Sequence, residues 1–329
     1  MISAYKWKKN WLNKLHSGGS VNIETIAVLG AGTMGHGIAQ LGAEASLNVV
    51  LCDISGPALE RAMKMIEAGI VIEGRTIEQC RAITGRIKGM TSIRDAVRSA
   101  GLVIECLPED LELKKKVFRE IDGICSPEVI LATNTSGLSP TEIAKGLSYP
   151  ERVVVAHFWN PPQLIPLVEI VPGERTSLSV VDAAVEWVRS LGKEPVRLKK
   201  ECPGFIGNRL QLALLREALY IVDEGYADIE EVDRSIIYGH GRRLPVTGPF
   251  LSADMGGLDI FHIISSYLFP VLCNAPEPSR LMQGLVEKGD LGMKSGKGFY
   301  DWNDEMRKKT IQLRTETLVH FLEKDTSKG

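Results

Sequence analysis

The chain has 329 residues, of which 44% are apolar and 24% are charged, so it has room for two globular domains with their own cores. Its formal net charge of −2 excludes the strongly basic surface of a typical nucleic-acid-binding protein, and a small molecule is the expected partner. No apolar run reaches the ~18 residues of a membrane span or resembles a secretory signal, so a membrane-spanning or secreted protein is not expected.

The first 22 residues contain four lysines and no acidic residue, with Trp7, Trp11 and Leu15 at helical spacing. This pattern fits two interpretations, an amphipathic helix that lies on a membrane or a loose tail. Residues 17–20 read Ser-Gly-Gly-Ser, which is typical of a flexible linker. We expect a tail over residues 1–22 and no membrane partner.

The next segment has the pattern of a dinucleotide-binding turn. A short apolar strand near residues 25–30 runs into Gly-x-Gly-x-x-Gly, and a helix follows. The first glycine permits the tight turn, the second lets a pyrophosphate approach the backbone, and the third lets helix and strand pack closely. The N–H groups at the helix start bind phosphates. The predicted cofactor-binding residues of this turn are Gly30, Gly32, Thr33, Met34 and Gly35.

Asp53 indicates which dinucleotide is expected. It ends a second apolar strand, 18 positions after the third glycine, where a carboxylate accepts hydrogen bonds from the adenosine ribose. A carboxylate repels a 2′-phosphate, and residues 54–57 provide no Arg or Lys to attract one. NAD is therefore favoured over NADP. A tight turn in another α/β protein can look similar, but the two strands and the acid together favour the dinucleotide site.

Apolar runs alternate with helical patterns up to about residue 200, which is typical of a mostly parallel, doubly wound Rossmann sheet. After Pro203 the strand signals stop, and helical spacing indicates an all-α part. We predict an α/β fold with a tail over 1–22, an NAD-binding Rossmann domain over 23–202 and a helical C-terminal domain over 203–329. The expected strands lie near residues 25–30, 48–53, 102–106, 129–133, 152–156, 167–171 and 194–198.

His157 and Glu169 are the strongest candidates for chemistry. His157 follows an apolar run, at the carboxyl end of an expected strand, where ligands bind in open α/β folds. Glu169 interrupts another apolar strand, and a buried carboxylate requires a partner such as His157. A His held by a Glu is a suitable general base for an alcohol, because it accepts the hydroxyl proton while a hydride leaves for the nicotinamide. A purely structural His–Glu hydrogen bond is the open alternative.

Other polar residues are weaker candidates. Asn134 and Ser136 follow an expected strand, where such residues usually form a turn. Asn208, near the start of the helical domain, either reaches a ligand or caps its helix. Glu109 and Lys114 either contact the cofactor or form a solvated charge pair. The histidines show no spacing typical of a metal site, and six cysteines without a Cys-x-x-Cys pair suggest a reducing cytoplasm.

Six segments in this order carry a family resemblance: GAGTMGHGIAQ at 30–40, NTS at 134–136, HFWNP at 157–161, LVE at 167–169, PGFIGNR at 203–209 and GKGFY at 296–300. Together they resemble the L-3-hydroxyacyl-CoA dehydrogenase family over about residues 24–302. The resemblance implies an NAD-dependent oxidoreductase of fatty acid metabolism that dimerises through its helical domain.

The resemblance also implies roles for single residues. It makes His157 the catalytic base and Glu169 its orienting partner. Ser136 and Asn208 would contact the substrate oxygen, and Asn160 would help to hold the loop at the substrate. Near NAD, the resemblance places Glu109, Lys114 and Asn134.

Two segments depart from the acyl-CoA pattern. Residues 67–74 are apolar and acidic where the family has Ser and Lys contacts to CoA. Residues 159–167 are more similar to relatives that oxidise free hydroxy acids or alcohols, such as gulonate, carnitine and pyridoxine-catabolism dehydrogenases. Arg242 and Arg243 suit a substrate carboxylate, although they equally suit a CoA phosphate or solvent.

The leading expectation is therefore reversible hydride transfer between an L-3-hydroxyacyl-CoA and NAD. The first alternative is an NAD-dependent dehydrogenase of a free hydroxy acid or alcohol. An alternative of another class is a non-catalytic NAD-binding protein, against which the intact His157 and Glu169 argue.

Overall fold

The computed structural model describes residues 23–72 and 74–327. These residues group into two compact units. The first runs to Ile206 and also includes the residues from Leu313 on, and the second spans Gly207–Gln312. The expected tail over residues 1–22 lies outside the described residues, and the expected domain limits at residues 202 and 203 stay a prediction.

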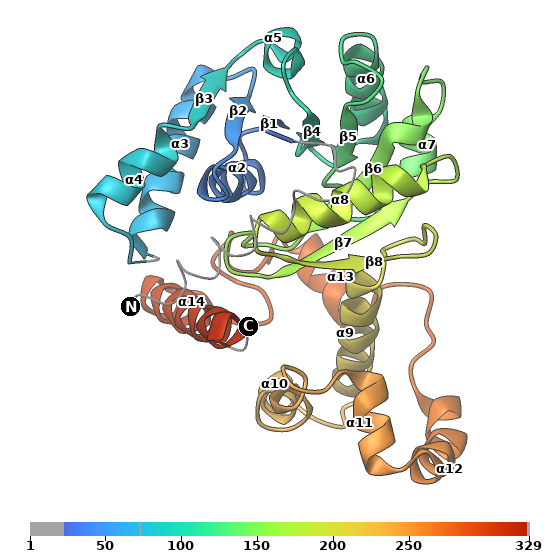
Figure 1. Cartoon of the computed structure of the whole chain (residues 1–329). Helices are drawn as coiled ribbons and strands as arrows, with labels where there is room; N and C mark the ends of the chain where they lie inside the picture. The colour runs from blue at the N-terminus through green and yellow to red at the C-terminus, as the bar shows by residue number, and fades with distance from the viewer. Residues whose placement is uncertain (1–22, 73, 328–329) are drawn as a thin grey trace. The chain divides into compact units, whose positions relative to one another are not determined.

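The first unit is built on an eight-stranded sheet with the order β3-β2-β1-β4-β5-β6-β7-β8 (Figure 1). All neighbours are parallel except β6 and β7, which are antiparallel. The run from β3 to β6 has the order of a doubly wound Rossmann sheet, so the predicted fold class is confirmed. The strands are β1 (Thr25–Leu29), β2 (Asn48–Cys52), β3 (Ile87–Met90), β4 (Leu102–Glu105), β5 (Ile130–Thr133), β6 (Val153–Phe158), β7 (Leu167–Pro172) and β8 (Glu194–Arg197).

Helices cover both faces of this sheet. Side chains of α2, α3 and α8 pack with Ile26 and Val28 in one buried cluster, and those of α5, α6 and α7 pack with Ala27 and Leu29 in another. Because successive strand residues point to opposite faces, the central strands must be apolar throughout. The helices of this unit are α2 (Gly35–Glu44), α3 (Gly56–Ile72), α4 (Ile77–Thr84), α5 (Ile93–Val97), α6 (Leu111–Asp122), α7 (Pro140–Ala144), the 3₁₀ turn η1 (Pro150–Arg152) and α8 (Leu178–Ser190).

The second unit is helical, as the sequence predicts. Its first helix ends at Asp223, and Gly225 follows shortly after with a φ of +71°, a left-handed conformation that glycine adopts without strain. None of the described helices is both long and apolar enough to cross a membrane. The elements are α9 (Gly207–Asp223), α10 (Ile229–Tyr238), η2 (His240–Arg242), α11 (Pro249–Gly256), α12 (Leu258–Leu268), η3 (Phe269–Val271) and α13 (Arg280–Glu287), followed by α14 (Asp304–Ser327), whose residues from Leu313 on group with the first unit.

Candidate active site

The turn between β1 and α2 has the tight packing expected of the glycine motif. A Cβ atom on Gly30, whose φ is +102°, would lie 2.7 Å from the Cys106 carbonyl oxygen. A Cβ atom on Gly35 would lie 1.8 Å from the Gly30 carbonyl oxygen, so a larger residue at either position displaces the turn. Gly32 faces open space, and α2 begins without a side-chain cap from Met34. The open backbone and the uncapped helix end fit a pyrophosphate.

Asp53 lies beside this turn, directly after β2. Its Oδ2 atom accepts a hydrogen bond from the Ala31 N–H group and its Oδ1 atom accepts one from the Ser55 N–H group, each at 2.9 Å. The carboxylate is thereby fixed where an adenosine ribose would bind. Burial, with the charge of Asp53 as the next cause, raises the pKa of the neighbouring Cys52 thiol to about 11. This thiol therefore stays protonated at neutral pH.

A buried ion pair connects the ends of β4 and α6. The Lys114 ammonium lies 2.6 Å from the Glu105 carboxylate, and both side chains are buried. Lys114 also donates to the Leu107 carbonyl oxygen at 3.2 Å, and the Thr133 hydroxyl group donates to the second Glu105 oxygen at 2.6 Å. The network joins the ends of three elements. The sequence analysis considered Lys114 as a cofactor contact but did not predict this network, because its members come from different elements of the chain.

Glu109 joins this network to the turn after β5. Its Oε1 atom accepts hydrogen bonds from the Thr135 hydroxyl group at 2.6 Å and from the Ser136 N–H group at 2.9 Å. Its other oxygen lies 3.5 Å from the Lys114 ammonium. The structure therefore brings Glu109, Lys114 and Ser136 together, and the Glu109 carboxylate fixes the backbone of the turn that presents Ser136.

His157 and Glu169 face each other across the antiparallel pair β6 and β7. They are directly opposite in the register of the two strands, so their side chains share one face of the sheet. The His157 Nδ1 atom donates to Glu169 Oε2 at 2.9 Å, and the two residues are 5% and 0% exposed. This bond leaves Nε2 as the ring atom for a substrate. The pairing has the geometry of a general base with an orienting carboxylate.

Two further donors hold the Glu169 carboxylate. The Trp159 indole Nε1 atom donates to Oε2 at 3.3 Å, and the Ile206 N–H group donates to Oε1 at 2.9 Å. Phe205 reaches this position through a left-handed conformation with φ of +53°, which is uncommon for a residue other than glycine. The His157 ring lies 5.8 Å from the Trp159 ring and 5.6 Å from the Phe205 ring, measured between centroids. Aromatic side chains therefore flank the imidazole.

The loop after β6 is held by residues that the sequence analysis missed. Lys193, which is buried, donates to the carbonyl oxygens of Gln163 at 2.9 Å and of Ile165 at 3.1 Å. The Gln163 amide donates to the buried Gln40 of α2 at 3.3 Å. Lys193 follows a helix in a pattern that is typical of a solvated residue, so only the fold reveals its contacts.

Asn134 and Asn160 have different settings. The Asn134 Oδ1 atom accepts a hydrogen bond from the Phe158 N–H group at 2.8 Å, which ties the end of β5 to β6. Asn160 is exposed and precedes Pro161 through a cis peptide bond. Asn134 thus lies beside the strand of His157, whereas Asn160 begins the exposed loop.

Two family models match the chain. One is the NAD-binding domain of 3-hydroxyacyl-CoA dehydrogenase, over residues 25–202, and the other is the C-terminal domain of the same enzyme, over residues 204–302. The chain belongs to the 3-hydroxyacyl-CoA dehydrogenase family. It is an oxidoreductase of this family, and its cofactor is NAD.

Relatives with different named substrates resemble the chain. A 5-formyl-3-hydroxy-2-methylpyridine 4-carboxylate 5-dehydrogenase of Mesorhizobium japonicum is 38% identical, with 90% of this chain and 96% of the relative covered. A crystal structure of an enzyme with this activity has a TM-score of 0.86 at 36% identity and covers 93% of this chain and 99% of its own. A crystal structure of an (S)-3-hydroxybutyryl-CoA dehydrogenase from Ralstonia eutropha has a TM-score of 0.71 at 35% identity, with coverages of 86% and 100%.

Three of the candidate substrate residues belong to the helical unit. Asn208 is half-buried in the first turn of α9. Arg242 donates through Nε to the Ile237 carbonyl oxygen at 3.0 Å, and its guanidinium lies 5.2 Å from the centre of the Tyr238 ring. Arg243 is exposed. Arg242 is therefore engaged within its own unit, and the substrate contacts of all three residues stay predictions.

The family's GKGFY segment has a structural contact in the helical unit. The Tyr300 hydroxyl group donates to Asp233 Oδ2 at 2.8 Å, which ties this segment to α10. Burial, with the hydrogen bond to Asp233 as the next cause, raises the pKa of Tyr300 to about 12. The phenol therefore stays protonated as a hydrogen-bond donor at any ordinary pH.

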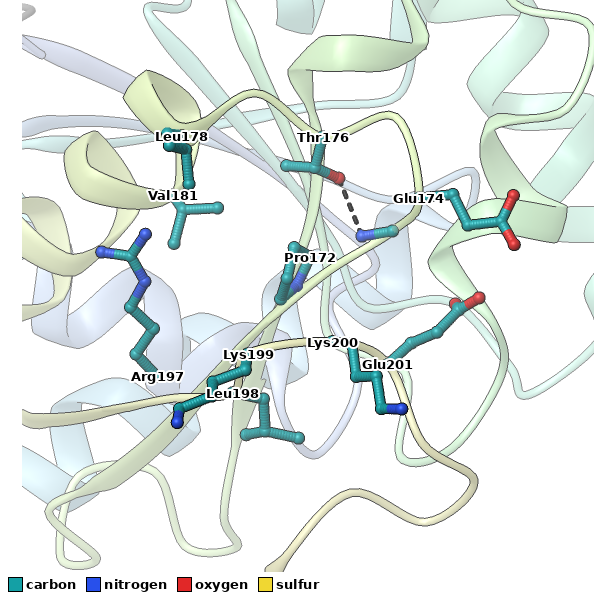
Figure 2. A pocket seen from close by; sticks show the side chains of 11 residues that line it. Pro172, Glu174, Thr176, Leu178, Val181, Arg197, Leu198, Lys199, Lys200 and Glu201 are labelled. Atoms are coloured by element: carbon teal, nitrogen blue, oxygen red, sulfur yellow. Dashed lines mark hydrogen bonds between the residues drawn. The ribbon is translucent and has the colours of Figure 1, made fainter.

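A hollow of about 490 Å³ lies at the other end of the sheet, beside β7, β8 and the start of α8 (Figure 2). Pro172, Val181 and Leu198 form its apolar lining, with Arg197 and Glu201 at its sides. None of the candidate site residues of this family member lines it. The hollow is therefore separate from the His157 and Glu169 pair.

Proposed function

We propose that the chain is an NAD-dependent dehydrogenase in which His157 exchanges a proton with the substrate hydroxyl group. The pairing of His157 with Glu169 at 2.9 Å, in a buried position at the end of β6, carries this proposal. In oxidation, Nε2 of His157 accepts the hydroxyl proton as the alcohol becomes a carbonyl group, and in reduction the imidazolium returns it. Bound NAD supplies the acceptor for the hydride that leaves the same carbon.

The other side chains orient and stabilise in this proposal. Glu169 keeps Nδ1 protonated and stabilises the imidazolium that forms. Ser136 and Asn208 are assigned to the substrate oxygen, where they stabilise developing negative charge. The turn at Gly32 and the carboxylate of Asp53 hold the pyrophosphate and the ribose of NAD.

For the substrate, we propose a small hydroxy or oxo compound with a free carboxylate rather than a CoA thioester. The second half of α3 supports this choice. Val71 and Ile72 are each 64% exposed there, and residues 65–72 contain no basic side chain. The phosphates of CoA require cations or N–H donors. Similarity to the pyridine carboxylate enzyme over 96% of that relative's length adds support.

An L-3-hydroxyacyl-CoA is the second candidate. It was the leading expectation from the sequence, and the family description favours it. Arg61 and Lys64 are exposed on the first half of α3 and are cations that a CoA phosphate would require. With this substrate, the enzyme would act in fatty acid metabolism.

The test follows NADH absorbance with the full chain and with a His157→Gln variant. One arm offers acetoacetyl-CoA with NADH, and the other offers NAD with free substrates, namely 3-hydroxybutyrate, carnitine, gulonate and hydroxymethylpyridine carboxylates. Turnover of a free acid without thioester reduction supports our first choice. Rapid thioester reduction replaces it with the second. NAD binding with no turnover in either arm identifies a non-catalytic NAD-binding protein and ends the dehydrogenase proposal.

We also propose that the chain forms a homodimer through its helical unit. Phe250 and Met255 of α11 are 88% and 75% exposed, and Leu258 at the start of α12 is also exposed. Among the described residues of this unit, Leu219 is the one buried apolar side chain, and it is 8% exposed. An apolar surface of this extent is typical of a protein–protein interface, and a second copy is the partner that the family resemblance implies.

A further inference from the structure

Trp159 contacts the His157 and Glu169 pair in a way that its sequence position does not show. Its indole Nε1 atom donates to Glu169 Oε2, the same oxygen atom that receives the hydrogen bond from His157 Nδ1. The two distances are 3.3 Å and 2.9 Å. Trp159 therefore shares with His157 the negative charge of one carboxylate oxygen.

We propose that Trp159 is a positioning residue that sets the pH at which His157 works as a base. The inference rests on the proposed function, because it assumes that His157 exchanges the substrate proton. A second donor on Oε2 withdraws negative charge from the contact with the imidazole, so the carboxylate stabilises the imidazolium less. His157 then remains neutral, and ready to accept a proton, at a lower pH than it would beside a carboxylate without this donor.

Burial of Glu169 makes the hydrogen bond from Trp159 a strong influence on the carboxylate. Glu169 is fully buried, and electrostatic interactions are stronger in such a medium than in water. The Ile206 N–H group holds the other oxygen, Oε1, at 2.9 Å, so the carboxylate is held from both sides. The Trp159 ring also lies 5.8 Å from the His157 ring, and His157 is 5% exposed.

Charged groups on the elements around β6 have contacts of their own. Glu105 at the end of β4 and Glu109 after it contact Lys114 of α6, and Glu109 also accepts from the turn after β5. On α7, Glu142 pairs with Lys115, and on α8, Glu186 and Asp182 pair with Arg189 and Arg197. Glu169 is the titratable group in hydrogen-bond contact with His157. The surrounding groups are Glu105, Glu109, Lys114, Glu142, Asp182 and Glu186.

Trp187 provides a matched control. It is also buried, it packs edge-on against the Phe158 ring at 5.9 Å, and its Nε1 atom has no acceptor among the described residues. The substitutions Trp159→Phe and Trp187→Phe therefore remove the same atoms from two indole rings, one directly after β6 and one packed against Phe158 of β6. Only the first removes a donor to Glu169.

The experiment measures the pH dependence of kcat in both directions of the reaction. For Trp159→Phe, we expect the midpoints of the oxidation and reduction profiles to move upward together by roughly 0.5–1 pH unit, because the lost donor is worth a fraction of a hydrogen bond to a charged group. For Trp187→Phe, both midpoints should stay in place. The plateau value of kcat should fall less than about tenfold for Trp159→Phe, against the far larger loss expected for His157→Gln.

A second measurement needs no folded variant at position 159. In the wild-type protein with ¹⁵N-labelled indoles and bound NAD, one Nε1–H resonance should titrate with the same midpoint as kcat/KM for the alcohol, and the resonance assigned to Trp187 should not. Unchanged midpoints for Trp159→Phe, equal shifts for both variants, or an indole that does not follow the rate would each overturn the inference. Full activity of His157→Gln would instead refute the proposed function, so the two failures are distinguishable.

Discussion

Glu169 accepts hydrogen bonds from His157, Trp159 and the Ile206 backbone, so its carboxylate has little rotational freedom. A fixed carboxylate orients the imidazole before substrate arrives, and this preorganisation lowers the reorganisation required during proton transfer. Single substitutions at this site should therefore change catalysis far more than they change cofactor affinity.

The first prediction concerns His157→Gln. Glutamine is similar in length but accepts no proton at neutral pH, so kcat should fall roughly 10²–10⁴-fold while the affinity for NAD stays unchanged. Steady-state rates and titration of the protein with NADH fluorescence measure the two quantities. A variant that keeps its kcat would show that another group is the base.

A second prediction concerns Arg243, the more available of the two candidate arginines. The Arg242 side chain already bonds to the Ile237 carbonyl oxygen and lies over the Tyr238 ring, whereas the hydrogen bonds of Arg243 within the described helical unit are made by its backbone. With a free acid as substrate, Arg243→Gln should raise KM by roughly 10–100-fold, the worth of a charge-assisted hydrogen bond, with a smaller change in kcat. Arg242→Gln is the control. An equal or larger rise in KM for the control would contradict the assignment.

Some site residues were predictable from the sequence and others were not. His157 and Glu169 stood out because polar residues at the end or in the middle of an apolar strand require an explanation. Lys193 and the pairing of Glu105 with Lys114 gave no such signal, because their partners come from distant elements or are backbone carbonyl groups. The hydrogen bond from Trp159 to Glu169 depends on the conformation of the loop after β6, which no pattern of residue types encodes.

At the scale of elements, a buried ion pair joins the end of α6 to η1. The Asp122 carboxylate lies 2.7 Å from the Arg152 guanidinium, and both side chains are buried. Burial raises the pKa of Asp122, but the hydrogen bonds from Arg152 and from the Ser148 N–H group outweigh it, and the pKa lies below its ordinary value. The carboxylate therefore stays charged in the folded protein at a pH where it is partly protonated in the unfolded chain.

The third prediction follows from this lowered pKa. The pair contributes its full stability above the ordinary pKa of an aspartate, about 3.9, and loses it as pH falls through the lower folded value. The Asp122→Asn variant should lose about 1.5–3 kcal/mol in free energy of unfolding at pH 7, and its stability should fall less steeply below pH ~4. Urea denaturation at several pH values measures this. Parallel curves for the two proteins would refute it.

The strands show what limits prediction at this scale. Seven strands were expected and are present, each within two residues of its expected limits, because strands that are buried on both faces read as apolar runs. The strand β3 was missed because it has four residues at the sheet edge, including Lys88 and Gly89. The antiparallel direction of β7 was not predicted, although the eight residues between β6 and β7 are too few for a crossover helix.

At the scale of the whole molecule, the helical unit exposes many large apolar side chains, such as those of Phe250, Met255 and Leu258. Its fold class was predictable from helical spacing, but the spacing does not tell a face that packs inside one chain from a face that packs on another. Phe250 and Met255, which are both strongly exposed, are the residues that decide between these cases.

The fourth prediction is that Phe250→Asp with Met255→Asp converts a homodimer into a monomer. Two charges buried on an apolar interface require desolvation without partners, which strongly weakens the association. Light scattering coupled to size exclusion should give twice the mass of one chain for the wild type and a single mass for the variant. A wild-type protein that is monomeric at micromolar concentration would refute the homodimer.

The reversal of β7 has one further consequence. Because side chains alternate between the faces of a strand, a slip of one residue between β6 and β7 would turn Glu169 away from His157 and leave the imidazole without its acid. The backbone pairing of the two strands thus keeps His157 and Glu169 opposite each other, and the short connection between the strands makes none of these backbone hydrogen bonds. Residues 160–166 can therefore be exchanged to admit a different substrate while Trp159 is kept and the reacting pair retains its geometry, which makes this part of the connection the place to begin redesigning specificity.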